Sequence, residues 1–439
     1  MKKNAALVIA LLSTLFLSLW IGSFSSAKIS PSTIVVPDDY PTIQEAVDNA
    51  TAGDKVFVKN GVYYEQIVID KPISLIGEDS QKTVIAGDRF HYSDSAIEVD
   101  AGNVTISGFT IRDYFYPPAI SVGVLGKLPV GVRIVGNNIE NNSVGIRPFG
   151  QKDPTTGLEQ PANLIISGNN ITQNGQGIYC DTSNVTISAN NITGNGLGIG
   201  IADAVNVTIT GNTIKSNGIS GSLNDSGGLR LTWYGPFYVY GNDITDNQGY
   251  GVQFDSGCNN STVHDNNIER NLIGINLFNF LIDGDSTIGS GNIVYHNNLV
   301  DNSHQVFIEK EGRYAANFNY TYANGTDIVS WDNGKEGNYW SDYIAKYPNA
   351  REIDSSGIGD IPYVIDANNI DNYPIMQPVT TSTVTPSPPT PSPPSTLALI
   401  VPGVVVVVAV LAVAVLVYWR KQKSNRLSKA TSTSTLKIQ

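Results

Sequence analysis

Cysteine, methionine and histidine are scarce in this chain of 439 residues, which holds 2 Cys, 2 Met and 4 His. Two methionines argue against a Met-rich copper carrier, and the sequence has no CxxC, HxH or HExxH motif that would hold a metal. Charged residues are also few, at 15%. A helix-rich coiled coil or solenoid, which draws on Glu, Lys and Ala, is therefore disfavoured.

Positive charge is sparse in the body of the chain and gathers at its two ends. Between Lys3 and Arg420 there are 19 Lys and Arg against all 39 Asp and Glu, a balance of −20. Such a body repels polyphosphate. No nucleic-acid partner is expected.

The first 27 residues predict a signal peptide. Lys2 and Lys3 precede an apolar run, 5–21, and small residues up to Ala27 offer a cleavage site. An uncleaved N-terminal anchor is the alternative, because the apolar run is long for a signal.

The other end predicts a membrane anchor. Residues 379–395 are rich in Pro, Ser and Thr, which is typical of an extended stalk. Residues 396–419 carry a long uncharged run that predicts a transmembrane helix, and the basic tail 420–439 would lie in the cytoplasm. The sequence thus predicts a single-pass type I protein of the cell membrane, with the lipid bilayer as a partner and an extracellular ectodomain.

A repeat of Asn-x-Ile/Leu-x-x-Asn dominates the body. Its seven copies begin at Asn137, Asn169, Asn190, Asn212, Asn242, Asn266 and Asn297. A weaker copy, 108–111, lacks both asparagines. Alternating β-branched residues between the copies predict short strands. The spacing indicates coils of about 21 to 24 residues that stack with asparagines in ladders. The fold class expected is all-β, a right-handed parallel β-helix.

This organisation divides the ectodomain into three parts. Residues 28–110 hold an N-terminal cap and the first coils, where an amphipathic helix over 38–47 is expected to cover the end of the solenoid. Residues 111–310 carry the Asn repeats. Residues 311–378 are rich in aromatics, which indicates a C-terminal cap, with a sugar-stacking platform as the alternative.

Three stretches resemble a known family. They are 35–65 (VVPDDYPTIQEAVDNATAGDKVFVKNGVYYE), the GNNIT-x-N-x-x-GI coils, and 337–343 (GNYWSDY). Together they resemble archaeal and bacterial surface proteins with NosD-like β-helix domains, in the wider carbohydrate-binding and sugar-hydrolase class that is similar to pectin lyases in fold. The resemblance implies the fold, while members include lyases, hydrolases, binders and spacers. It also implies a role in metal-site assembly as one candidate, although this chain shows no cluster of copper ligands.

The strands that follow the Asn corners predict a ligand-binding face. Period-two alternation sends residues such as Ile178, Ile199 and Leu229 into the core and their successors outward. The outward residues, called here the outer column, are Arg147, Tyr179, Gly200, Arg230, Gln253 and Asn276. Beside them stand Asp181, Asp203, Trp233 and Asp255. A dip at Gly200 and walls from insertions 148–161 and 219–227 would make a groove that suits a polysaccharide. An ordinary solvated strand face is the alternative.

Catalysis on this face would depend on Asp181, Asp203 and Arg230. A glycosidase needs two carboxyls about 5 Å or about 6.5–9.5 Å apart, and Asp181 and Asp203 meet this only if their coil positions converge. A lyase would need an acidic calcium site and a basic proton acceptor, a role open to Arg230. Neither enzyme's active-site signature is present. The expected role is therefore non-catalytic binding of glycan or partner protein, or an envelope component, with a lyase or hydrolase as the alternative.

Metal sites and modification complete the expectations. The histidines are His91, His264, His296 and His304, at positions that do not stack, and no cofactor is expected apart from calcium as a weak candidate at Asp354 and Asp360. Cys180 and Cys258 fall three coils apart, about 14 Å along the axis, so two buried thiols are predicted. The candidate glycosylation sites are Asn103, Asn184, Asn206, Asn224, Asn319 and Asn324.

Overall fold

The structure, a computed structural model, describes residues 31–87, 95–123, 129–150, 161–218, 226–255, 257–278, 289–308 and 329–380. The predicted signal peptide, nearly all of the stalk, the predicted transmembrane helix and the tail lie outside these residues, as do the tips of both predicted insertions. Within these ranges, no helix has the length and apolar character needed to cross a membrane.

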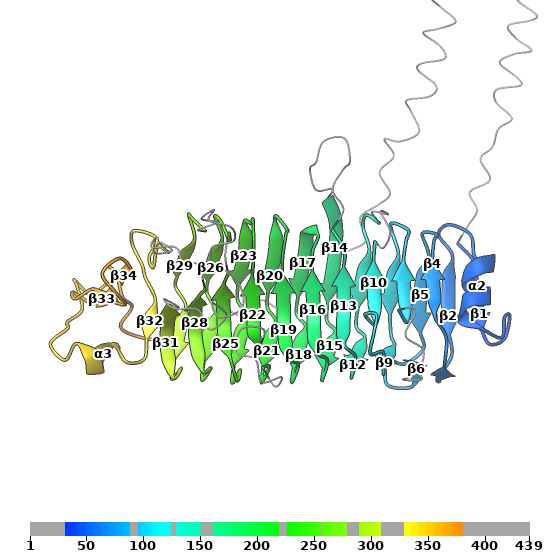
Figure 1. The fold of residues 1–439 in the computed structure, drawn as a ribbon, viewed down its shortest axis with the longest axis horizontal. Coiled ribbons are helices and arrows are strands. Elements are labelled where there is room, and N and C mark those ends of the chain that lie inside the picture. Colours follow the sequence, from blue (N-terminus) through cyan, green and yellow to red (C-terminus); the bar gives the residue numbers. More distant parts are fainter. Residues whose placement is uncertain are drawn as a thin grey trace, which may run out of the picture. The chain divides into compact units, whose positions relative to one another are not determined.

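The chain winds into a right-handed parallel β-helix with three sheets, as the repeat predicts (Figure 1). Sheet A runs in the order β1 (Thr33–Val36), β2 (Lys55–Val58), β5 (Ser74–Gly77), β8 (Thr105–Ser107), β11 (Arg133–Val135), β14 (Pro161–Ser167), β17 (Ser183–Ser188), β20 (Val207–Thr210), β23 (Phe237–Tyr240), β26 (Thr262–His264) and β29 (Ile293–Tyr295). Sheet B runs β3 (Gly61–Tyr63), β6 (Thr83–Ala86), β9 (Thr110–Arg112), β12 (Asn138–Glu140), β15 (Asn170–Thr172), β18 (Asn191–Thr193), β21 (Thr213–Lys215), β24 (Asp243–Thr245), β27 (Asn267–Glu269), β30 (Asn298–Val300) and β32 (Tyr339–Trp340).

Sheet C carries the candidate face. Its strands are β4 (Ile67–Ile69), β7 (Ile97–Val99), β10 (Ile120–Val122), β13 (Val144–Pro148), β16 (Gln176–Cys180), β19 (Leu197–Ile201), β22 (Gly227–Leu231), β25 (Tyr250–Phe254), β28 (Ile273–Leu277) and β31 (His304–Ile308). A short antiparallel pair, β33 (Tyr363–Val364) and β34 (Ile370–Asp371), belongs to the C-terminal cap.

Two asparagine ladders run along the corners on either side of sheet B. The first joins Asn137, Asn169, Asn190, Asn212, Asn242, Asn266, Asn297 and Asn338. The second joins Asn142, Asn174, Asn195, Asn217, Asn247, Asn271 and Asn302. At each step the backbone N–H and the side-chain Nδ2 of one asparagine donate to the Oδ1 of the next, as Asn190 does to Asn212 at 3.0 Å for both bonds. The ladders therefore satisfy buried polar groups that a corner would otherwise leave unpaired.

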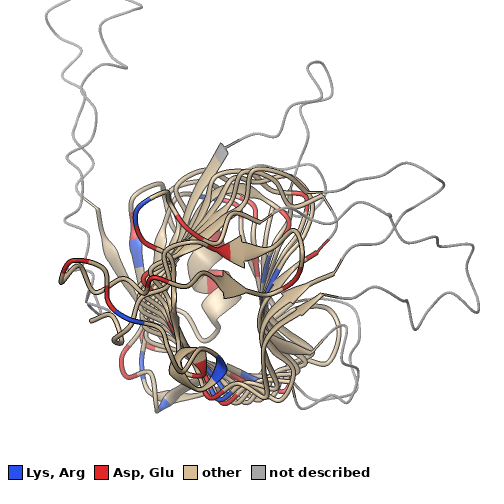
Figure 2. Ribbon diagram, turned by 90° about the vertical axis from the view of Figure 1, so that its left-hand side faces the viewer, with Lys and Arg blue, Asp and Glu red and all other residues tan. Residues whose placement is uncertain are grey.

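Between the sheets, identical apolar positions stack into a continuous core. Ile139, Ile171, Ile192 and Ile214 are direct partners along sheet B and are fully buried. Seen along the axis, the Lys, Arg, Asp and Glu residues are distributed around the coil (Figure 2). The sequence periodicity correctly predicts that these isoleucines lie in the core, because alternate residues of a strand point to opposite sides of the sheet.

The N-terminal end is covered by α2 (Ile43–Asn49), which buries Ile43, Ala46 and Val47 as predicted. The helix begins five residues later than the expected start at Asp38. Thr42 caps it by accepting a hydrogen bond from the backbone N–H of Glu45 at 3.2 Å. The preceding residues form a turn in which the Asp39 carboxylate accepts from the N–H of Val35 at 2.7 Å.

The aromatic-rich C-terminal segment is a cap, as the sequence indicates. Trp331, Trp340 and Tyr343, the first residue of α3 (Tyr343–Lys346), are buried in the end of the core, and Trp340 stacks on Tyr363 with ring centroids 4.1 Å apart. The division at residue 311 needs one correction. Asn338 continues the first ladder and β32 pairs with β30, so the segment also contributes strand to a last coil.

Candidate functional site

The outer column exists as the sequence predicts. Register pairs Tyr179 with Gly200, Gly200 with Arg230, Arg230 with Gln253, and Gln253 with Asn276 along sheet C. The preceding isoleucines and their equivalents, Ile178, Ile199, Leu229, Val252 and Ile275, are fully buried in the core. The alternation of sides at this part of the strand is confirmed.

At the start of the sheet C strands, two consecutive residues face the core, so the inward and outward positions do not alternate regularly there. A Cβ on Gly177 would lie 3.2 and 3.3 Å from the γ2 methyls of the core residues Ile192 and Ile171, so this glycine faces inward together with Ile178. The residue before the glycine then faces outward. Leu197 and Tyr250 hold this position in their coils and are buried, although neither belongs to the central core. The face therefore has an apolar second row that strict period-two reasoning does not place there.

The expected dip at Gly200 is filled. A Cβ on Gly200 would lie 2.9 Å from Cδ2 of Tyr179 and 3.1 Å from Cδ2 of Leu197. The tyrosine ring leans along the axis onto the next coil because the glycine has no side chain to stop it. The ring of Tyr250 packs over Gly227 in a similar way, because a Cβ on Gly227 would lie 2.6 Å from Cδ2 of Tyr250. The prediction of a hollow between Tyr179 and Arg230 is therefore wrong.

Arg147 is the centre of a compact polar cluster. Its Nη2 lies 3.1 Å from Oδ2 of Asp181, and its guanidinium carbon lies 4.7 Å from the ring centre of Phe149 and 5.0 Å from that of Tyr179. Burial, and then the Asp181 carboxylate, raise the pKa of the Tyr179 hydroxyl, and Arg230 and Arg147 oppose that rise. The sequence predicts Arg147, Tyr179, Asp181 and Arg230 on one face, and it does not predict the contact with Phe149.

The C-terminal half of the outer column is not an open groove. Gln253 and Asn276 are 1% and 4% exposed, whereas the side chains of Arg147 and Asp181 are 35% and 22% exposed. Nδ2 of Asn276 donates to Oε1 of Gln253 at 2.8 Å. The predicted groove from Arg147 to Asn276 is thus accessible only in its first half, and its second half is a buried polar layer outside the core.

Unmet hydrogen-bonding capacity is concentrated on this face. Four residues keep a buried polar atom without a hydrogen-bond partner in the described parts of the chain: Arg147 (Nε), Thr232 (Oγ1), Gln253 (Nε2) and Asn276 (Oδ1). In sheets A and B, over the same described ranges, no buried side-chain atom lacks a partner. Such atoms are uncommon in folded proteins and mark places where water or a ligand belongs.

The predicted acids fall at separate places. Asp181 and Asp255 follow β16 and β25, and each donates its N–H to the coil before it, at 3.1 Å to Pro148 and 2.8 Å to Leu231. They share one coil position three coils apart, about 14 Å along the axis. Asp203 lies one residue further along its coil than Asp181, because Ala202 takes the position equivalent to Asp181 by donating to Cys180. No two of these acids share one position in adjacent coils.

Trp233 lies at the corner after β22 and not on the strand. It and Tyr234 both have positive φ, 46° and 70°, a conformation that bulky residues rarely adopt. Tyr234 is 48% exposed. The corner therefore adds aromatic surface beside Thr232.

Two histidines meet at one carboxylate, which the sequence does not predict. Nδ1 of His264 lies 2.5 Å from Oδ2 of Asp265, and Nδ1 of His296 contacts the other oxygen. Burial would raise the pKa of Asp265, but the two histidines outweigh burial and lower it. His264 also stacks between Tyr240 and Tyr295, with both centroids at 5.2 Å. The contact between Asp265 and His296 could have been predicted from the sequence, because the two residues hold the same position in adjacent coils.

The remaining candidates stand as follows. His304 is exposed at the start of β31, and His91 lies outside the described residues. In the part of the chain that the structure describes, no three His, Cys, Asp or Glu residues are arranged to hold a metal ion. Asp360 accepts the N–H of Arg351 at 2.8 Å, while Asp354 has φ 45° in a tight turn.

Both cysteines are buried thiols that are not joined in a disulfide, as predicted. Of the candidate glycosylation sites, Asn103, Asn184 and Asn206 lie at left-handed corners with φ between 56° and 58°. Nδ2 of Asn206 donates to Oδ1 of Asn184 at 2.6 Å. Asn224, Asn319 and Asn324 fall outside the described residues.

Comparison with known families agrees with this architecture. Residues 157–335 match the family described as "Right handed beta helix region", and residues 47–234 match "Periplasmic copper-binding protein (NosD)". Each match covers less than half of the chain, so the chain is similar to these families over parts of its β-helix. No curated protein matches this chain in sequence.

Several solved structures are similar to this protein in fold. An alginate lyase from Paenibacillus sp. is 15% identical, with 63% of this chain and 98% of that chain covered and a TM-score of 0.48. Pectate lyase Pel9A is 14% identical, with 70% and 81% covered and a TM-score of 0.47. The A-module of the mannuronan C-5 epimerase AlgE4 of Azotobacter vinelandii is 16% identical, with 62% and 93% covered and a TM-score of 0.41. These activities are those of the similar proteins.

Proposed function

We propose that this chain is a non-catalytic polysaccharide-binding protein and that the outer face of sheet C is its binding surface. One observation carries the proposal. Four described residues keep a buried polar atom without a partner, and all four lie on this face: Arg147, Thr232, Gln253 and Asn276. In the described parts of sheets A and B, no buried side-chain atom lacks a partner.

The chemistry of these atoms suits sugar hydroxyls. The Nε of Arg147 and the Nε2 of Gln253 are donors, while Oδ1 of Asn276 is an acceptor and the Thr232 hydroxyl is both. A hydroxyl group can donate and accept at once, so a sugar can pair with Arg147 in the accessible half of the face, while Gln253 and Asn276 form a buried polar layer behind it. The aromatic surface of Phe149 and Tyr179 beside Arg147 adds the apolar part that such sites combine with a few polar groups.

The same geometry argues for binding without cleavage. Asp181 and Asp255 are about 14 Å apart along the axis, well beyond the carboxyl separations of about 5 to 9.5 Å at which glycosidases work. The candidate pair Asp181 and Asp203 lies on adjacent coils at positions one residue apart, so the two acids are not stacked partners. Asp181 is also paired with Arg147 at 3.1 Å, so its carboxylate is already engaged by a neighbouring side chain of the face. Arg230 interacts with Tyr179 and stays protonated at any physiological pH.

The proposal includes a location at the outside of the cell membrane. It relies on sequence segments alone, the signal-like 1–27 and the apolar 396–419. Protease treatment of intact cells should remove the β-helix and leave the C-terminal tail protected. If the protease cleaved the protein only after the cells were lysed, this location would be contradicted.

The test is co-elution of fluorescent acidic and neutral polysaccharides with the purified full-length chain, at once and after a day. We expect early co-elution with unchanged polysaccharide length. Arg147→Ala should lose co-elution, while Arg133→Ala on sheet A, also half-buried, should keep it. Progressive shortening would show an enzyme, and Asp181→Asn with Asp203→Asn would then test the catalytic candidates. Absence of co-elution across the panel would overturn the proposal.

A further inference from the structure

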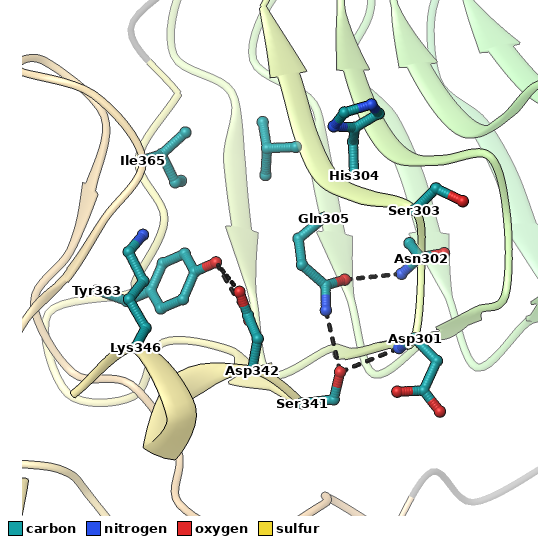
Figure 3. Close-up of a pocket in the computed structure, with 11 residues that line it drawn as sticks. Asp301, Asn302, Ser303, His304, Gln305, Ser341, Asp342, Lys346, Tyr363 and Ile365 are labelled. Carbon is teal, nitrogen blue, oxygen red and sulfur yellow. Dashed lines mark hydrogen bonds between the residues drawn. The ribbon is translucent and has the colours of Figure 1, made fainter. Parts of the chain in front are cut away.

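The C-terminal end of sheet C holds a pocket of about 480 Å³ between the last coil and the cap (Figure 3). The last coil supplies Asp301, Asn302, Gln305 and Val306, and the cap supplies Ser341, Asp342, Lys346, Tyr363 and Ile365. In Figure 3, Ile365, Tyr363 and Lys346 lie on one side of the space, across from Gln305 and Asn302. The volume is in the range of small-ligand sites.

The second asparagine ladder ends at this pocket. In the six preceding members, from Asn142 to Asn271, the backbone N–H donates along the axis to Oδ1 of the next asparagine, at 2.9 to 3.0 Å. Asn302 is the last member, and its own N–H has no acceptor among the described residues. Asn302 is only 9% exposed. An unpaired, nearly buried donor at this place is costly unless something accepts from it.

The chain leaves the coil just where the next ladder residue would stand. Leu299 pairs with Trp340, so the position that follows Asn302 along the axis belongs to Tyr343, which starts α3. The first ladder has no such gap, because the N–H of its last member, Asn338, donates to the Asp371 carboxylate at 2.7 Å. One ladder is closed by the chain itself and the other opens into the pocket.

The side-chain amide of Asn302 is already engaged. Its Nδ2 donates to Oε1 of Gln305 at 2.9 Å, and Nε2 of Gln305 donates to the Ser341 hydroxyl at 3.0 Å. A ligand therefore has to supply one acceptor oxygen, in the place where every earlier coil has an amide oxygen. Two carboxylates, Asp301 and Asp342, line the pocket together with one ammonium group, Lys346, and with His304. With His304 neutral, this balance makes an anionic ligand unfavourable.

The other walls complete the match to an amide. Asp342 accepts from the Tyr363 hydroxyl at 3.0 and 3.2 Å and, like Asp301, can accept from an amide N–H. Val306 and Ile365 form an apolar wall against which a methyl group can pack. An acetamido group has the same carbonyl as an asparagine side chain, an N–H and a methyl.

We propose that this pocket binds the acetamido group of an N-acetylated amino sugar, whose carbonyl oxygen completes the second ladder by accepting from the N–H of Asn302. The site is separate from the outer column and does not depend on polysaccharide binding there. The sugar ring itself would extend from the pocket toward solvent.

The test is titration of the full-length chain, kept in mild detergent, with N-acetylglucosamine, followed by ligand-observed NMR. We expect saturable binding, with glucose, which lacks the amide, at least about tenfold weaker, a difference of about 1.4 kcal/mol. Ile365→Trp should abolish binding by filling the pocket. Val364→Trp is the matched control, because Val364 is exposed and is not among the lining residues, and it should bind as the parent does.

The outcomes separate this proposal from the polysaccharide-binding proposal. Arg147→Ala should leave N-acetylglucosamine binding unchanged, because it alters only the outer face. Absence of binding to the parent chain, or equal binding by the Ile365→Trp protein with an unchanged melting temperature, would overturn the pocket assignment. Equal binding of glucose would overturn its acetamido specificity.

Discussion

The ring of Tyr179 covers Gly200, its partner in the next coil, so closely that a Cβ on the glycine would lie 2.9 Å from the ring. This places the tyrosine between Arg147, which lies over its ring, and Arg230, whose charge partly offsets the rise that burial causes in the tyrosine pKa. The glycine thus sets the geometry of the accessible half of the candidate site.

Gly200→Ala should force the ring of Tyr179 away and destabilise the protein by about 1 to 3 kcal/mol, the usual cost of overpacking. The measurement is chemical denaturation. Tyr179→Ala alone removes the obstacle, so adding Gly200→Ala to that variant should cost much less than in the parent. Equal costs in the two backgrounds would mean that the contact with Tyr179 is not the source of the strain.

Asn190→Ala should destabilise the protein by about 3 kcal/mol or more, since it leaves several buried groups unpaired. Asn190 is fully enclosed and bonds to Asn169, Ile166 and Asn212. Its neighbour is the matched control, because Asn191 is exposed and should tolerate Asn191→Ala with a loss of about 0.5 kcal/mol or less. Similar losses for the two variants would refute the structural role of the ladder.

Asp371 should make the C-terminal cap sensitive to pH. Burial raises the pKa of this carboxyl to about 7, against hydrogen bonds from Asn338, Trp340 and Tyr373 that favour the charged form. The pKa of Asp371 in the folded protein therefore lies above the ordinary aspartate pKa of 3.8. The protonated state therefore contributes stability that is fully present below about pH 4 and is lost as pH rises to about 7.

Unfolding followed by tryptophan fluorescence, which reports Trp331 and Trp340 in the cap, should show this loss between pH 4 and pH 7. Asp371→Asn cannot ionise, so the difference in stability between parent and variant should change with pH across that window and level off above it. A difference that is constant with pH would contradict a raised pKa.

The two cysteines should be unreactive in the native state. Cys180 and Cys258 have exposed fractions of 0% and 1%, and reaction requires an accessible thiolate. A thiol-reactive dye should label neither residue in buffer and both in denaturant, with no shift in gel mobility on reduction. Rapid labelling of the native protein would show that the coil opens at these positions.

The coil architecture could be predicted from the sequence because it repeats. The asparagines that anchor the copies at Asn137 and Asn169 fix the register, and alternation then assigns Ile178 to the core and Tyr179 to the surface. Asn338 was assigned to the cap because a single copy of the repeat, after a long interruption, carries no periodicity.

Details of the face could not be predicted, since they depend on side-chain direction and local bends. Gly177 faces the core next to Ile178, which no alternation rule foresees, and Gly198 does the same in the next coil, so Leu197 before it faces outward. Whether Gly200 makes a hollow depends on the direction in which Tyr179 leans along the axis. Spacing contains no information on that choice.

The asparagine ladders also make the length of the molecule adjustable. Every coil receives the same pair of bonds from one neighbour and gives the same pair to the other, so a coil does not need to recognise which coil lies beside it. One coil more or fewer changes the reach of the solenoid by about 4.8 Å and leaves both ends intact. Whole coils can therefore be added to or removed from such a solenoid without changes to the residues of its core.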